Sequence, residues 1–130
     1  MRASPLACPI LLLLSGCAGG LQGAWSGSCD MNDGEYGEEI FLDLWIDSDL
    51  GRRIKGDAQV TLPSEGVFQV ALEGEHTLDA ALLQLTIPAA EGDLALTFEG
   101  LRDADELEGT CELWVPGATA PVVGRGDLER

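Results

Sequence analysis

The sequence predicts an all-β protein, a small antiparallel up-and-down barrel of about eight strands that follows a cleaved N-terminal leader. Apolar and polar residues alternate over several segments of strand length. Turn-forming residues separate these segments at fairly regular intervals, and short connections join antiparallel neighbours. Glycines recur inside the segments, which the closure of a small barrel requires.

The leader occupies residues 1–16. It carries Arg2, the apolar run Ile10–Leu14 and then the small residues Ser15 and Gly16. This run is shorter than the roughly 20 apolar residues needed to span a bilayer, so it indicates a secretory signal. Its ending, Leu14-Ser15-Gly16-Cys17, resembles the lipobox of bacterial lipoproteins.

That resemblance implies that signal peptidase II recognises Leu14, Ser15 and Gly16 and cleaves before Cys17, whose sulfur receives a lipid. In enterobacteria an Asp directly after the cysteine resembles an inner-membrane retention signal, and Ala18 in that position favours the outer membrane. An ordinary secretory signal, cut elsewhere and leaving Cys17 a plain thiol, is the alternative. The expected organisation is a signal peptide (1–16), a lipidated Gly-rich tether (17–23) and one barrel domain (24–130).

Composition limits the partners of the mature chain. Without the leader, 114 of the 130 residues remain, enough for a single domain with a modest core. Loss of Arg2 changes the formal charge from −16 to −17. A field of that sign repels nucleic acid and anionic lipid, so the membrane attachment must come from the lipid on Cys17. We expect a monomer.

Eight strands are expected between residue 24 and the end of the chain. They are Ala24–Cys29, Glu39–Asp47, Arg53–Leu62, Val67–Glu73, Leu78–Ile87, Asp93–Leu101, Glu106–Val115 and Val122–Glu129.

The alternation gives each strand an apolar and a polar face. It is clearest in Arg53–Leu62 and Glu106–Val115, whereas Phe41 and Trp45 make the outer face of their strand less polar. The segment Leu78–Ile87 also fits a short helical pattern, but its shortness and the proline that follows favour a strand.

A short pattern of an apolar residue, a charged residue and glycine recurs in four of these strands. Its glycine falls on the same face as the apolar residue two positions earlier, so it should point inward and allow the strands to coil and close. The glycines of the pattern are Gly56, Gly74, Gly100 and Gly109.

The opening Gly23-Ala24-Trp25 resembles the Gly-x-Trp signature of the lipocalin and avidin-like calycin barrels. In that family the tryptophan plugs one barrel end beside an arginine from near the last strand. The resemblance implies that Trp25 is the plug and that Arg125 or Arg130 is its partner.

The cysteine count predicts one disulfide. Cys8 leaves with the signal peptide and Cys17 takes the lipid, so Cys29 and Cys111 remain, and such a pair in an exported protein is typical of a bridge. Two separate buried thiols are the alternative. Both side chains should point inward, yet strands one and seven of a barrel lie about 10 Å apart, beyond a disulfide's reach. The bridge therefore requires either a path through the barrel interior, made possible by strong coiling at Gly109, or a Cys29 that has left its strand. We favour the second and expect Cys29 to lie in the loop that begins at Asp30.

Catalytic and metal-binding patterns are weak. The acidic loop Asp30–Glu35 fails the EF-hand register, although weak binding of a divalent cation there stays open. His76, the only histidine, lacks a nucleophile motif and is expected in a turn or at the surface. The sequence therefore predicts no enzyme activity, no cofactor and no metal site.

Two classes of function remain. The first is a non-enzymatic, lipid-anchored envelope protein that binds another envelope protein or has a structural role. The second is a carrier of a small apolar ligand of the calycin type. The inward positions are mostly large aliphatic residues, which predicts a filled core and favours the first class.

Overall fold

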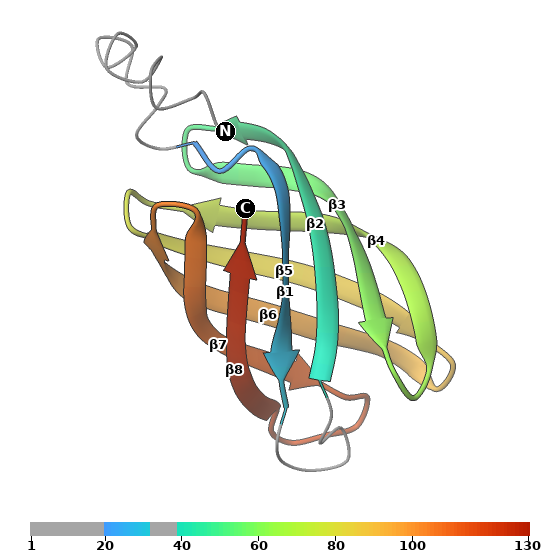
Figure 1. The fold of residues 1–130 in the computed structure, drawn as a ribbon. Coiled ribbons are helices and arrows are strands. Elements are labelled where there is room, and N and C mark those ends of the chain that lie inside the picture. The colour runs from blue at the N-terminus through green and yellow to red at the C-terminus, as the bar shows by residue number, and fades with distance from the viewer. Residues whose placement is uncertain (1–19, 32–38) are drawn as a thin grey trace, which may run out of the picture.

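The computed structural model describes residues 20–31 and 39–130. The expected signal peptide, Cys17 and residues 32–38, which include most of the acidic loop, lie outside this range. The described chain forms a closed antiparallel barrel in which each strand pairs with its neighbours in sequence and β8 pairs with β1 (Figure 1). Its strands are β1 (Gly23–Asp30), β2 (Glu39–Leu50), β3 (Arg53–Leu62), β4 (Gly66–His76), β5 (Ala80–Ala89), β6 (Gly92–Asp103), β7 (Glu106–Trp114) and β8 (Val122–Glu129).

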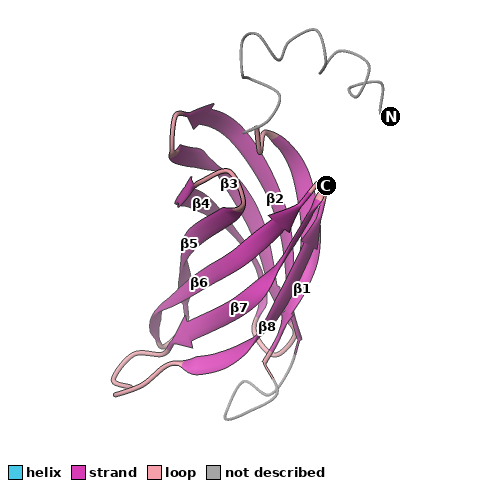
Figure 2. Cartoon of the chain, turned by 90° about the vertical axis from the view of Figure 1, so that its left-hand side faces the viewer, coloured by secondary structure: helices cyan, strands magenta, loops and turns pink. Residues whose placement is uncertain are grey.

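The predicted fold class is confirmed, and the described residues contain strands and loops without a helix (Figure 2). The helical alternative for Leu78–Ile87 is wrong, because β5 runs from Ala80 to Ala89 with its odd-numbered residues buried from Ala81 to Ile87. That two-residue period can place only one face of the segment in the core.

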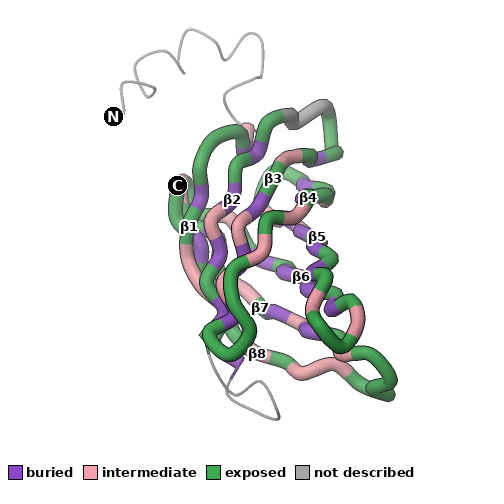
Figure 3. Tube along the Cα trace, turned by 90° about the vertical axis from the view of Figure 1, so that its right-hand side faces the viewer, coloured by how far each residue is buried: buried purple, intermediate pink, exposed green. Residues whose placement is uncertain are grey.

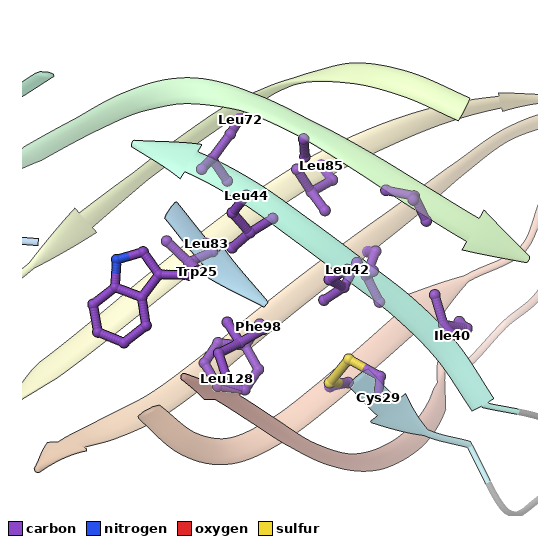
Figure 4. Packing of buried hydrophobic residues seen from close by; sticks show 14 of the residues in the cluster. Trp25, Cys29, Ile40, Leu42, Leu44, Leu72, Leu83, Leu85, Phe98 and Leu128 are labelled. Atoms are coloured by element: carbon purple, nitrogen blue, oxygen red, sulfur yellow. A yellow bond between two sulfur atoms is a disulfide. The ribbon is translucent and has the colours of Figure 1, made fainter. Parts of the chain in front are cut away.

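Buried apolar side chains from all eight strands fill the interior, and the burial colours of Figure 3 alternate along the strands. Trp25 lies at one end of this cluster and Cys29 toward the other (Figure 4). The cluster is built chiefly from leucine, with single large residues such as Trp25, Met31 and Phe98. The large aliphatic residues that the sequence analysis expects at the inward positions thus form the core.

Glycine lets neighbouring strands approach where the sheet coils. A Cβ added at Gly109 would lie 1.9 Å from the carbonyl oxygen of Glu99 on the next strand, and the corresponding contacts are 2.0 Å at Gly56 and 2.1 Å at Gly74. No residue with a side chain fits such a gap. The recurring glycines therefore bring the strands close enough to close the barrel.

The seam between β4 and β5 is paired over only part of its length. β4 pairs with β5 through Leu72–His76, but Gly66–Ala71 of β4 and Thr86–Ala89 of β5 continue past the last pair without a partner on that side. Over the same stretches β4 still pairs with β3, and β5 with β6. The strands thus part toward the barrel end that lies opposite Trp25.

Candidate functional site

The barrel end at the start of β1 is closed by Trp25. Its side chain is 1% exposed, and its indole Nε1 donates a hydrogen bond of 2.8 Å to the carbonyl oxygen of Leu21, which is also buried. The guanidinium carbon of Arg130 lies 4.8 Å from the centroid of the Trp25 ring. This is the geometry of a cation–π contact at the rim of an apolar core.

Arg130 also joins three parts of the chain. Its Nε and one terminal nitrogen donate to the carboxylate Oδ1 of Asp105 in the β6–β7 turn, at 2.9 and 2.8 Å. The other terminal nitrogen donates to the carbonyl oxygens of Gly20 and Gln22, both at 3.1 Å. The segment that leads into β1 is therefore fixed to the closed end.

The two arginines proposed as partners of Trp25 occupy different places. Arg130 stacks on the ring, whereas Arg125 is exposed on β8, opposite Asp30 of β1 and Thr110 of β7. Arg125 lies at the end of β1 remote from Trp25, so of the two it is Arg130 that the fold brings to the plug.

The segment that leads into β1 enters the barrel at the closed end. Gly20, the first described residue, is bonded to Arg130, and Cys17 is three residues earlier in the chain. Three residues span at most about 11 Å. Cys17 and the lipobox residues Leu14, Ser15 and Gly16 lie outside the described residues.

The disulfide between Cys29 and Cys111 is confirmed, with a Cα–Cα distance of 6.1 Å, but its expected place in the loop is wrong. Cys29 lies inside β1, where it pairs with Ile40 of β2 and Gly126 of β8. Both sulfurs are fully buried, so the bridge runs through the barrel interior.

Glycines in β8 explain how the bridge passes over the strand between its two ends. Cys29 is opposite Gly126 and Cys111 is opposite Gly124, so β8 presents no side chain where the bridge crosses. A Cβ on Gly126 would lie 2.6 Å from the Cys111 sulfur. Strong coiling at these glycines brings the first and seventh strands within the 4.4–6.8 Å range of disulfide Cα distances.

The predicted place of His76 is also wrong. It was expected in a turn or at the surface, but its side chain is only 7% exposed. β4 extends three residues beyond the expected Glu73, so the two-residue period places His76 on the same inward row as Leu72. Its Nδ1 lies 3.2 Å from the carbonyl oxygen of Thr77.

The outer face of β2, β3 and β4 carries two exposed aromatic side chains, and we call its central part the β2–β4 face. The strand register aligns its outward residues in three rows, which are Phe41–Thr61–Val67, Asp43–Gln59–Gln69 and Trp45–Asp57–Ala71. Phe41 is 45% and Trp45 47% exposed, and Gln69 donates a 2.8 Å hydrogen bond to Gln59. The sequence indicated this surface only through the two aromatic residues in outward positions.

The opposite wall, β6 to β8, is acidic. Glu106 faces Glu129 across the β7–β8 pair, and Glu108 faces Asp127. Partial desolvation and repulsion from Glu129, Asp127, Glu108 and Asp103 raise the pKa of the Glu106 carboxyl above its ordinary value. Like charges opposite one another destabilise a sheet, so this wall costs stability at neutral pH.

Within residues 20–31 and 39–130, no group of three or more histidine, cysteine or acidic side chains is arranged to hold a metal ion. Of the acidic loop, Asn32, Asp33 and Glu35 lie outside that range. In the same described range, no helix is long and apolar enough to cross a membrane.

No protein-family model matches the chain, and no curated protein sequence is significantly similar to it.

Proposed function

We propose that this protein is a non-enzymatic, lipid-anchored component of the bacterial cell envelope that binds another envelope protein through its β2–β4 face. The anchor is the lipid on Cys17, and Ala18 favours the outer membrane. The observation that carries the binding role is the pair of exposed aromatic side chains, Phe41 and Trp45, which project from the same side of β2.

Exposed aromatic side chains support protein binding for a physical reason. Tryptophan, with tyrosine and arginine, dominates the energetic centres of protein interfaces, because a large rigid ring loses little entropy when it is buried. Phe41 and Trp45 are four residues apart on one strand, so they face the same way about 13 Å apart along it. Asp43 and Asp57 between and beside them supply hydrogen-bond acceptors for a partner.

We propose that the closed end of the barrel lies near the membrane, because the segment after Cys17 enters the barrel there. Arg130 hydrogen-bonds the carbonyl oxygens of Gly20 and Gln22 and so fixes the tether segment to the barrel. The negative charge of the barrel disfavours its lying flat on anionic lipid.

Site-specific photo-cross-linking in living cells tests the binding role. A photoreactive phenylalanine analogue replaces Trp45, and a matched variant carries it in place of Trp114, which is outward-facing and 40% exposed on β7. We expect one discrete protein product from position 45, absent from position 114 and lost when Phe41 is changed to Ser. Equal products from both positions, or none from either, would overturn the binding role of this face.

The alternative function, a carrier of a small apolar ligand in the calycin manner, is favoured by a different observation. Five half-buried apolar residues pack against the core, and all of them lie toward the barrel end remote from Trp25: Phe68, Val70, Ala89, Val115 and Val122. A ligand would have to sit in this mouth, because side chains fill the interior. Native mass spectrometry of protein from its own host would detect such a ligand as an added mass.

A further inference from the structure

The parted seam leaves one strand edge of the barrel without a neighbour. Gly66–Ala71 of β4 pairs with β3 on one side and has no β5 partner on the other. An edge of this kind presents a row of unpaired N–H and C=O groups that accept another extended chain. Six residues match the usual length of one strand.

Pro88 gives a reason why β5 does not close the seam. It lies within Thr86–Ala89, the stretch of β5 that pairs with β6 alone. Proline has no N–H to donate and is found at the edges of sheets for that reason. A continuous β4–β5 ladder would lack a donor at this position, whereas the β4 edge is free of proline and can form a full ladder with an incoming strand.

The seam is apolar on its inner side. Phe68 and Val70 point inward from β4 but stay half-buried, because no β5 residue covers them. On the outer side a groove of about 500 Å³ runs along the point of separation, with the core residues Leu85 and Leu96 among its lining. An added strand would place alternate side chains against Phe68 and Val70 and direct the others outward.

Charge limits what can occupy this seam. The stretches Gly66–Leu72 and Ala80–Ala90, which include both free edges, contain no charged residue, although 23% of the chain is charged. A charged side chain on the inner side would lose hydration against Phe68 and Val70. On the outer side, Glu73 is the one charged residue in the lining of the groove, and it would repel an acidic side chain. The occupant that fits is therefore uncharged and extended.

We propose that the free edge of β4, Gly66–Ala71, docks an extended, uncharged segment of the partner protein, which adds to the barrel as a strand. This rests on the proposed function of the protein as a binding module and names how the partner is held. Val67, Gln69 and Ala71 of the same stretch form the β4 column of the β2–β4 face, so a strand added there continues that face. Backbone hydrogen bonds supply affinity in this mode of recognition, and alternate side chains supply specificity.

Hydrogen exchange of the mature protein tests the free edge first. We expect amides within Gly66–Ala71 to exchange about tenfold or more faster than those of Arg53–Leu62, which has a neighbour on both sides. Uniformly slow exchange across β4 would show a closed seam and overturn the proposal.

The second step adds a capped peptide of alternating threonine and valine. We expect protection of Gly66–Ala71 by about tenfold at about 1 mM peptide, where even a weak complex is populated. The same peptide with every second nitrogen methylated is the matched control and should protect nothing, since it lacks the N–H groups of one edge. An absence of protection by the unmodified peptide would overturn the proposal.

A cross-linked variant supplies a control in the protein itself. Ala71 and Thr86 are the first exposed positions beyond the last β4–β5 pair, Leu72 with Leu85. A disulfide in Ala71→Cys/Thr86→Cys should abolish the peptide effect, and reduction should restore it. If this bridge does not form, Gln69→Pro, which removes an N–H from the edge, should reduce the peptide effect.

Three other outcomes overturn the proposal in distinguishable ways. Protection that rises with protein concentration and without peptide would assign the edge to a second copy of this chain. Equal protection by decanol, which has no backbone, would assign the seam to a small apolar ligand. Peptide effects confined to Phe41 and Trp45 would leave the proposed function intact and reject strand addition.

Discussion

Removal of the Cys29–Cys111 disulfide should cost the barrel a large part of its stability. The bridge joins residues separated by 82 positions. In the chain-entropy model, a loop of that size restricts the unfolded chain by about 15 cal/mol/K, which stabilises the fold by about 4.5 kcal/mol at 25 °C. This is a large share of the roughly 5–15 kcal/mol that holds a typical domain together.

The variant Cys29→Ala/Cys111→Ala, with Cys17→Ser in every protein compared, isolates that contribution. Urea unfolding of the variant should show a free energy of unfolding lower by about 4.5 kcal/mol, or a midpoint about 2 M lower for an ordinary slope of about 2 kcal/mol/M. The small sulfur-sized gaps left in the core add to the loss. Reduction of the parent protein under denaturing conditions, followed by refolding with its thiols kept reduced, should reproduce most of the change.

The reasoning would be refuted by a change of less than about 1 kcal/mol in both the variant and the reduced protein. Such a result would mean that the unfolded chain is already compact around these residues, since the model assigns the whole gain to the unfolded state.

Three further changes test the plug, the acidic wall and the coiled strands. Arg130→Ala should lower stability by about 1 kcal/mol in urea unfolding and speed exchange of the Trp25 indole N–H, while Arg125→Ala should do neither. Glu106→Gln should raise the melting temperature at about pH 7 but not at about pH 3.5. Because the pKa of Glu106 is raised in the folded state, the folded protein binds this proton more tightly than the unfolded chain, and the parent loses stability as pH rises through that pKa. An equal rise in the melting temperature of Glu106→Gln at both pH values would contradict this. Gly109→Ala should cost about 3 kcal/mol or prevent folding, because its Cβ would meet the Glu99 carbonyl, whereas Thr110→Ala should be near neutral; a stable Gly109→Ala protein would contradict the close approach.

The strands were the most predictable part of the molecule, because alternation is a local property. Arg53–Leu62 and Val122–Glu129 begin and end at the expected residues. The position of His76 was missed because nothing in the residues Glu75 to Thr77 signals that β4 continues to them. The end of β4 is set by its pairing with β3 and β5, and that pairing depends on residues of those two strands.

The contacts that form the candidate sites were less predictable, since they depend on how far the sheet coils. The disulfide partners followed from counting cysteines, but the path over Gly124 and Gly126 depends on three strands at once. The choice of Arg130 over Arg125 likewise required the register of β8 on β1. The free edge at Gly66–Ala71 had one local signal, the proline at position 88, which becomes meaningful only when β5 is known to lie beside β4.

The mass and N-terminal sequence of the mature protein, isolated from the membranes of its host, test the central claim most directly. The lipid-anchor account predicts a chain that begins at Cys17 and carries two or more acyl chains, as stable membrane attachment requires. It also predicts that Cys17→Ser releases the protein from the membrane fraction. A mature chain that begins elsewhere with an unmodified Cys17, or membrane association unchanged by Cys17→Ser, would contradict it.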